Sequence, residues 1–216
     1  GFTNINLIGS LITLVSGGNV GGGIINIDDS SQLLFGSTFN NTLNASLGHV
    51  AGGDGSAIVN NGANVSLNQA NAFAGNWQIN QGGTLTASNS NQLGTTSITL
   101  NGTLNLNEML TSNNALTGNG TLNIDTANNT FNFGGNTGTA FAGTVDMSNS
   151  NFVLNGNNTS ALHNALFIAS AGTSVGVGSG NQAIGDFTLN GGIVGFIDGS
   201  LISTDTLAVT DNSTIR

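Results

Sequence analysis

Cysteine, proline and tyrosine are absent from this 216-residue chain, and the only Lys or Arg is Arg216, its last residue. Without cysteine the chain forms no disulfide framework and offers no thiolate to a metal. Without lysine and further arginine it lacks the cations that neutralise phosphates, which excludes a nucleic-acid interface and weighs against an anionic membrane surface. Ten acidic residues stand almost unopposed and give a formal net charge of −9.

Long apolar runs are also missing. None approaches the ~20 residues that span a bilayer as a helix, so we expect no membrane insertion by this segment. No signal peptide is visible and the chain opens on Gly1, as expected for a mature or excised segment. With 38% hydrophobic residues the chain can build a core. No composition shift marks a linker, and we predict that residues 1–216 form one solenoid segment of a larger protein.

Short stretches that alternate apolar and polar residues recur between turns of Gly, Asn and Ser. Period-two alternation predicts β-strands with one buried and one solvated face. Clear examples are Ile25-Asn26-Ile27, Val65-Ser66-Leu67, Ile98-Thr99-Leu100, Leu104-Asn105-Leu106, Leu122-Asn123-Ile124, Phe131-Asn132-Phe133 and Phe187-Thr188-Leu189. Helical periodicity is scarce, and Ser160–Ala171 is the best helix candidate.

An internal repeat organises the middle of the chain. Ala72–Asn80 (AFAGNWQIN) aligns with Ala140–Ser148 (AFAGTVDMS), and a polar turn and a further strand follow each copy. The copies lie 68 residues apart (141 − 73 = 68 for their Phe residues), an interval that fits three coils of roughly 23 residues in a solenoid. After the second copy, Phe152 and Leu154 fall at the outward parity, which indicates a corner or a one-residue slip.

These patterns predict an all-β fold, a parallel β-helix whose coils stack into an elongated solenoid. Stacked coils place each strand ~4.8 Å from its equivalents, so inward Val, Ile, Leu and Phe form columns and outward Asn and Thr form ladders. The absence of Pro suits strands that are paired on both sides. A β-sandwich or a propeller is the rival fold, because alternation does not distinguish parallel from antiparallel pairing.

The two repeat copies resemble the passenger-associated transport repeat, and the chain is similar to the passenger of a Gram-negative autotransporter. The resemblance rests on AFAGNWQINQGGTLTAS, TAFAGTVDMSNSNFVL, ALTGNGTLNI and SITLNGTLNL, and it extends from Gly62 to Leu154 and on to Val209. It implies a right-handed β-helix that a C-terminal outer-membrane barrel of the parent chain exports to the bacterial cell surface or secretes. Many such passengers are adhesins, but the resemblance carries no functional residue onto this sequence.

The outward polar positions form the predicted ligand or self-association face. Any soluble solenoid needs a polar exterior, so no single position points to function. A long, weakly charged face can nevertheless join another surface through many small hydrogen bonds. The predicted face residues are Asn26, Ser66, Asn76, Gln78, Asn80, Thr99, Asn105, Asn123, Asn132 and Thr188.

Catalytic and metal-binding patterns are weak. His49 and His163 have no second ligand at metal spacing, and no GxSxG marks a nucleophile. Residues 52–58 (GGDGSAI) resemble a calcium-binding nonapeptide, but Ala57 replaces its required Asp and no second copy follows. The glycines of residues 17–23 lack the Lys and the helix of a phosphate cradle and predict a flexible turn. We therefore expect no metal, no cofactor and no catalytic residue.

The acidic residues are spread along the chain. Asp28 and Asp29 are adjacent and would point to opposite faces of a strand, so they do not form an acid–base pair. Scattered carboxylates weigh against a sugar-cleaving enzyme, although coils can bring distant residues together. These scattered acidic residues include Glu108, Asp125, Asp146, Asp186, Asp198, Asp205 and Asp211.

Trp77, the only Trp, poses the choice between a ligand platform and a core residue. It aligns with Val145 of the second copy, which predicts a buried indole.

The leading hypothesis is a non-enzymatic cell-surface adhesin segment that contacts itself on neighbouring cells, or a host matrix protein or glycan. A β-helical polysaccharide-processing enzyme or a phage-type spike is the alternative. A further alternative is an inert structural stalk.

Overall fold

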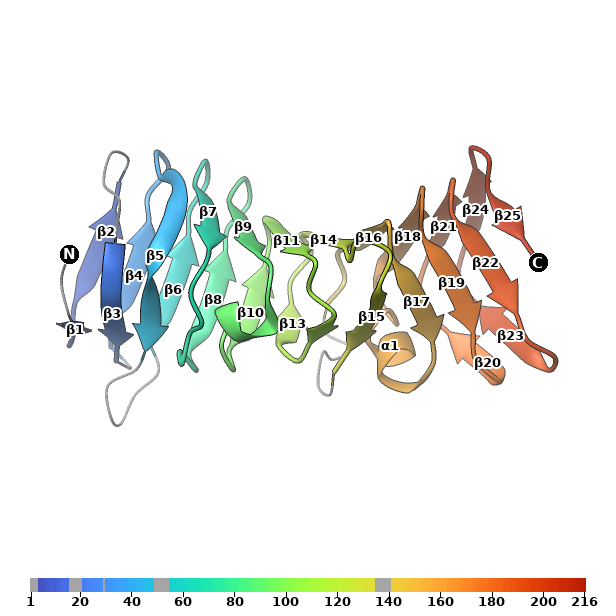
Figure 1. Cartoon of the computed structure of the whole chain (residues 1–216), viewed down its shortest axis with the longest axis horizontal. Helices are drawn as coiled ribbons and strands as arrows, with labels where there is room; N and C mark the ends of the chain where they lie inside the picture. The colour runs from blue at the N-terminus through green and yellow to red at the C-terminus, as the bar shows by residue number, and fades with distance from the viewer. Residues whose placement is uncertain (1–3, 16–20, 29, 49–54, 135–140) are drawn as a thin grey trace. The chain divides into compact units, whose positions relative to one another are not determined.

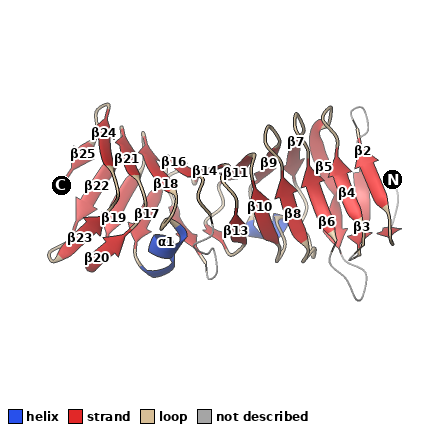
Figure 2. Cartoon of the chain, turned by 180° about the vertical axis from the view of Figure 1, so that it is seen from behind, coloured by secondary structure: helices blue, strands red, loops and turns tan. Residues whose placement is uncertain are grey.

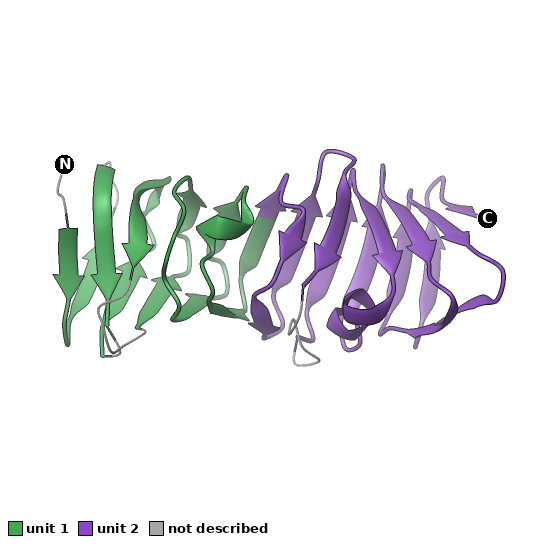
Figure 3. Ribbon diagram, turned by 60° about the horizontal axis from the view of Figure 1, so that its bottom comes forward, with its two compact units in different colours: residues 1–105 green, residues 106–216 purple. Residues whose placement is uncertain are grey.

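Two compact units, residues 1–105 and 106–216, make up the chain (Figure 3). A computed structural model describes residues 4–15, 21–28, 30–48, 55–134 and 141–216 (Figure 1). Short strands dominate both units (Figure 2). The only helical segments among the described residues are the 3-10 turn η1 (Ser90–Gln92) and the helix α1 (Gly156–Ala161).

Unit 1 contains two parallel sheets whose strands alternate along the chain. One has the order β1-β3-β5-β7-β9-β11 and the other the order β2-β4-β6-β8-β10. The strands are β1 (Asn4–Leu7), β2 (Leu11–Leu14), β3 (Gly21–Ile27), β4 (Gln32–Phe35), β5 (Asn40–Gly48), β6 (Ser56–Val59), β7 (Asn64–Leu67), β8 (Asn76–Ile79), β9 (Thr84–Ala87), β10 (Ser97–Leu100) and β11 (Thr103–Asn107), which ends just past the unit boundary.

Unit 2 also has two main parallel sheets, and in its last coils a third, two-stranded sheet forms from β20 and β23. Its strands follow the orders β14-β16-β18-β21-β24 and β12-β15-β17-β19-β22-β25, and β20 pairs with β23. The strands are β12 (Thr111–Ser112), β13 (Ala115–Thr117), β14 (Thr121–Asp125), β15 (Thr130–Phe133), β16 (Thr144–Ser148), β17 (Asn151–Leu154), β18 (Leu166–Ser170), β19 (Ser174–Val177), β20 (Gly180–Ala183), β21 (Phe187–Asn190), β22 (Ile193–Phe196), β23 (Ser200–Ser203), β24 (Leu207–Thr210) and β25 (Thr214–Ile215).

Parallel pairing in register confirms the β-solenoid and excludes a sandwich or propeller. Leu33 pairs with Ala57 on the next coil, and Ala57 in turn pairs with Trp77 one coil further. In unit 2 Val145 pairs with Phe167 in the same way. These paired residues are 24, 20 and 22 positions apart in the sequence (57 − 33, 77 − 57 and 167 − 145). The expected coil length of roughly 23 residues falls within this range. Each inward side chain therefore stacks on the inward side chain of the next coil.

The two repeat copies share a local device. Gly75 and Gly143 each lie under the ring of the Phe two residues earlier, and an added methyl would overlap that ring. The methyl would also strike the carbonyl oxygen of Gly55 or Gly120, one coil away. Those carbonyls accept hydrogen bonds from Asn76 N and Thr144 N at 3.1 and 2.9 Å. Only glycine lets the chain pass this close to its neighbouring coil.

A shorter corner explains the parity of the second copy. Gly82 (φ 78°) and Asn149 (φ 44°) both adopt the left-handed conformation that turns the chain between its two strands. Five residues (80–84) lie between the buried Ile79 and Leu85 of the first copy, but four (148–151) lie between Met147 and Phe152 of the second, and as a result Phe152 is buried like Leu85. The expected corner is therefore present.

Two expectations from the sequence need correction. The helix ends at Ala161, and Leu166–Ser170 forms β18, because its alternating half-buried and buried residues pair with β16 and β21. Gly21–Gly23 open β3 instead of a flexible turn, although the register shifts between Gly21 and Ile24. Residues 17–20 lie outside the described residues.

Buried aromatic rings contact one another in the core of each unit. In unit 2 a chain of rings runs through Phe131, Phe133, Phe152, Phe167 and Phe187, with successive centroids 5.0, 6.1, 5.4 and 5.3 Å apart. All five are buried. This contiguous stack stabilises successive coils by apolar burial and by ring contacts.

Candidate functional site

Trp77 is a core residue, as predicted. Its side chain is 0% exposed, its ring stacks at 6.3 Å from Phe35, and it meets Phe73 edge-on at 6.1 Å. The indole Nε1 donates a hydrogen bond of 3.2 Å to the carbonyl of Leu93. Trp77 therefore fixes the loop that carries η1 and offers no ring to a ligand. Sequence reasoning missed this anchoring role, although a buried indole N–H requires an acceptor.

The sheet β2-β4-β6-β8-β10 carries four of the predicted polar residues. Gln78 lies opposite Thr99, and Asn76 opposite Ser97 at hydrogen-bonding distance, 3.1 Å. Gln78 Nε2 donates to Asn80 Oδ1, also at 3.1 Å. We call the outward side chains of these five strands the β2–β10 face: Leu11, Thr13, Gln32, Leu34, Ser56, Ile58, Asn76, Gln78, Ser97 and Thr99.

The other sheet of unit 1 carries Asn26, Ser66 and Asn105. Asn26 Nδ2 donates to Asn6 Oδ1 at 2.8 Å, and Asn105 Nδ2 donates to Thr86 Oγ1 at 3.2 Å. Ser66 is paired with Thr86 across β7 and β9. The seven predicted residues of unit 1 thus divide between two sheets and do not form one surface.

In unit 2 the remaining predicted residues are likewise dispersed. Asn123 on β14 lies opposite Asp146, and Thr188 on β21 lies opposite Ile168. Asn132 lies on β15, in the other sheet. The structure therefore keeps all ten predicted side chains on strands or at strand ends, and in unit 1 it brings together those of β8 and β10.

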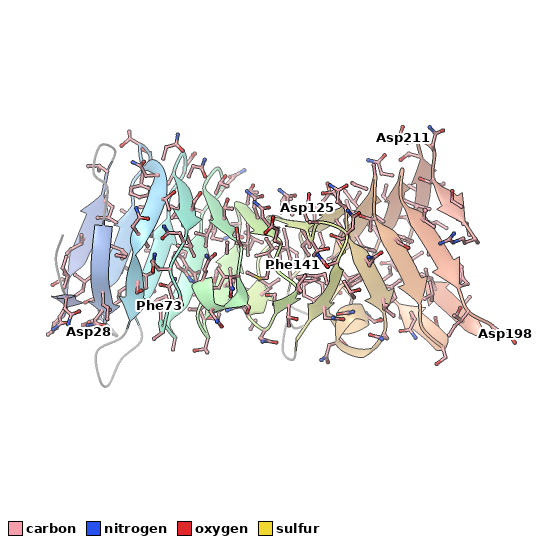
Figure 4. The ribbon with its side chains drawn as sticks, in the orientation of Figure 1. Asp28, Phe73, Asp125, Phe141, Asp198 and Asp211 are labelled. Atoms are coloured by element: carbon pink, nitrogen blue, oxygen red, sulfur yellow. The ribbon has the colours of Figure 1, made fainter. Side chains whose placement is uncertain are left out.

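Aspartates of unit 2 bind donors on the next coil. Asn149 Nδ2 donates to Asp125 Oδ2 at 3.0 Å, and Ser170 Oγ donates to Asp146 Oδ1 at 2.6 Å. Asp186 likewise accepts from Thr206 Oγ1 at 2.5 Å. By contrast, Asp198 and Asp211 are exposed and point away from the strands (Figure 4). The first three carboxylates act as links between coils.

Asp28 is the one described acid of unit 1. Ser31 Oγ donates to its Oδ1 at 2.6 Å, and Gly9 N does so at 3.3 Å from the preceding coil. The hydrogen bond from Ser31 lowers the pKa of the Asp28 carboxyl below its ordinary value, since it favours the charged form. Asp29, the neighbour considered with it, lies outside the described residues.

No group of three or more His, Asp or Glu side chains that could hold a metal occurs within the described parts of the chain. His163 is exposed beyond α1. His49 and Asp54 of the calcium-like motif lie outside the described residues, while Ala57 is buried in β6. Glu108 is exposed and holds a left-handed backbone, with φ 60°.

Buried hydroxyl groups at one corner of unit 2 were not predicted. Thr126, Ser150 and Thr173 are at most 1% exposed. Thr126 Oγ1 lies 3.0 Å from Ser150 Oγ, and Thr173 Oγ1 donates to Met147 O at 2.8 Å. Within the described residues no buried side-chain nitrogen or oxygen lacks a partner. The hydroxyls therefore stabilise the corner and leave nothing unpaired for a ligand.

An apolar hollow of about 250 Å³ lies in the last coils of unit 2. Phe187 and Val194 form its buried floor, while Phe196, Leu201, Leu207 and Ile215 are exposed at its rim. Apart from Thr204 its lining is hydrophobic, so it has the chemistry of an uncovered core and brings no charged group to a substrate.

Comparison with known proteins gives two relatives of undetermined activity. The chain is 34% identical over 131 residues to the uncharacterized protein YuaQ of Escherichia coli strain K12, an alignment that covers 58% of this chain and 10% of YuaQ. It is 26% identical over 199 residues to the uncharacterized lipoprotein YdeK of the same strain, covering 79% of this chain and 15% of YdeK. The chain thus spans a small part of each relative. No family model and no solved structure matches.

Proposed function

We propose that the chain is a non-enzymatic adhesive segment of a bacterial envelope protein. Its partner is the same protein on a neighbouring cell, or a host matrix protein or glycan. The observation that carries the proposal is the β2–β10 face, whose ten outward side chains include no charged residue. Such a face meets another weakly charged surface without repulsion between like charges.

The affinity of such a contact comes from the number of weak interactions across it. Each hydrogen bond made by Gln78, Thr99 or Ser56 adds only about 0.5–1.5 kcal/mol net. Leu34 and Ile58 lie in the same row of the sheet as Gln78 and Thr99, and their partly exposed side chains supply some apolar area. Many molecules on each cell then turn a weak contact into a strong one through avidity.

Placement in the envelope is supported by the relative YdeK, whose name describes it as a lipoprotein. The similarity of the repeat copies to autotransporter passengers points the same way. None of the described helices has the length and hydropathy that would let it cross a membrane.

An inert stalk is the second candidate, and a specific observation favours it. Asn26 binds Asn6, and Asn105 binds Thr86, so part of each ladder is used to join coils. A polysaccharide-processing enzyme requires converging carboxylates, whereas Asp125, Asp146 and Asp186 each bind a donor within the fold.

Display of residues 1–216 on the surface of a non-aggregating bacterium tests the proposal. We expect settling of the cells, or retention on matrix-coated plates, above that of cells displaying an unrelated solenoid. The double variant Gln78→Asp/Thr99→Asp introduces like charges on β8 and β10 of the face and should abolish the gain, because two such faces then repel.

The matched control is Asn132→Asp/Thr188→Asp, which adds the same charge to strands of unit 2, outside the β2–β10 face. The control should leave settling and retention unchanged, and circular dichroism should be the same for both variants. Settling and retention no greater than those of the unrelated solenoid would support the stalk and reject adhesion by this segment.

A further inference from the structure

Five Asn-Gly pairs occur in the chain. An Asn side-chain amide is open to attack by the backbone nitrogen of the following residue, and glycine hinders that attack least because it has no Cβ. Because the five pairs are chemically identical, differences in their reaction rates must come from the structure around each pair. The pairs are Asn61-Gly62, Asn101-Gly102, Asn119-Gly120, Asn155-Gly156 and Asn190-Gly191.

Three of the glycine nitrogens are occupied. Gly62 N donates to Gly82 O at 3.0 Å and Gly102 N donates to Ile79 O at 2.9 Å. Gly191 N donates to Ser213 Oγ at 2.8 Å. A nitrogen whose hydrogen is shared with an acceptor is held away from the preceding side chain and gives up its proton less readily.

Asn119-Gly120 is restrained by packing. Gly120 is buried, and its carbonyl oxygen accepts a hydrogen bond of 2.9 Å from Thr144 N. Gly143 lies directly against the Asn119–Gly120 peptide. Rotation of this peptide would disturb the glycine contact that the second repeat copy uses.

Asn155-Gly156 has none of these restraints. Asn155 is exposed and precedes α1, but its side chain makes no capping hydrogen bond. The Gly156 nitrogen opens the first turn of α1, where helices leave N–H groups without a helical acceptor. Among the described residues no hydrogen bond of this N–H is found. Nothing lies within 4 Å of the position that a Gly156 Cβ would take.

We propose that Asn155 is a site of spontaneous deamidation, the first of the five to react. Gly156 N loses its proton to hydroxide and forms a bond to Asn155 Cγ, and ammonia leaves. Water then opens the cyclic imide at either carbonyl, giving aspartate or isoaspartate. The product carries one more negative charge in a chain whose formal net charge is −9.

The reaction is coupled to opening of α1. Asn155 has ψ 153°, and its carbonyl accepts hydrogen bonds from Asn158 N at 2.9 Å and Thr159 N at 3.4 Å. The 155–156 peptide must rotate for attack, which breaks both bonds. A six-residue helix has little stability alone, and α1 is held by Asn158, whose Nδ2 donates to Val153 O at 2.7 Å.

Incubation of the intact chain at mildly alkaline pH, followed by mass spectrometry with fragmentation, tests the proposal. We expect Asn155 to be converted several-fold faster than each of the other four, with a rate that rises with pH because the nucleophile must lose a proton. Methyl transfer by an isoaspartyl methyltransferase identifies the isoaspartate product.

Asn155→Gln should remove the fastest event, whereas the matched variant Asn119→Gln should retain it. Asn158→Ala should speed conversion of Asn155 by loosening α1. Equal rates at Asn155 and Asn101, or an unchanged first event in Asn155→Gln, would overturn the proposal without reference to adhesion.

Discussion

Units 1 and 2 both stack parallel strands in register, but their outward side chains differ in chemistry. In the described part of unit 1 no strand from β1 to β10 contains a charged residue, whereas β14 and β16 of unit 2 carry Asp125 and Asp146. Those two carboxylates bind Asn149 and Ser170 of the next coil. The difference teaches that inward apolar columns suffice to build a coil. The outward positions are then free to link coils, as in unit 2, or to remain uncharged, as on the β2–β10 face.

The two units also differ in how aromatic rings are arranged in their cores. In unit 2 five Phe rings contact one another in sequence, whereas in unit 1 Phe35 and Phe73 both contact one large indole, Trp77, which lies between Ala57 and Ile98 in its column. The small Ala57 leaves room for the ring to reach Phe35 two coils away. Trp77 therefore takes part in two of the ring contacts of unit 1, whereas the ring contacts of unit 2 run along five Phe residues.

Among the substitutions that test the difference between the two cores, replacement of Trp77 should have the largest effect on stability. Trp77→Ala should lower the free energy of unfolding by about 3–5 kcal/mol through loss of buried area and creation of a cavity. Chemical denaturation followed by circular dichroism measures the loss. In the unchanged chain Trp77 should emit as a buried, blue-shifted indole that acrylamide quenches poorly. Strong quenching in the folded state would contradict its placement in the core.

The glycines of the two repeat copies test what the units share. Gly75→Ala and Gly143→Ala should each cost about 1–3 kcal/mol, because the methyl overlaps backbone and ring atoms. Gly176→Ala is the control, since its methyl would meet nothing closer than 3.9 Å, and its stability should stay within about 1 kcal/mol of the parent. Denaturation midpoints compare all three. A tolerated Gly143→Ala with a damaging Gly75→Ala would show that only the first copy is tightly packed.

The smallest expected effect concerns pH and unit 1. The pKa of Asp28 is lowered in the folded state, so its hydrogen bonds stabilise the fold above the unfolded value of 3.8 and this contribution is lost as pH falls through the folded pKa. Asp28→Asn should therefore reduce stability at neutral pH and have less effect at strongly acidic pH. Thermal unfolding of parent and variant at both pH values measures this. Equal destabilisation at both would exclude a role for the ionised carboxylate.

The strand pattern and the core were predictable because alternation is local. Stretches such as Val65-Ser66-Leu67 carry their inward and outward positions in consecutive residues, and the burial of Trp77 followed from its alignment with Val145. The helix predicted over Ser160–Ala171 was wrong beyond Ala161, where α1 ends, and Leu166–Ser170 is a strand because pairing with β16 and β21 outweighed a weak local preference. The buried Thr126 and Ser150 escaped prediction, because their partners lie a whole coil away.

The sequence by itself determined that the chain is a stack of short strands with a weakly charged polar exterior and no cationic surface. Alternation and composition are properties of neighbouring residues, and they need no knowledge of which coils meet. Only the tertiary structure decided which polar residues share a sheet. It separated Asn26, Ser66 and Asn105 from Gln78 and Thr99, because coil length and corner position set the face to which each strand turns. It also distinguished Asn155 from four chemically identical pairs, since hydrogen bonding and packing of the following glycine depend on distant segments.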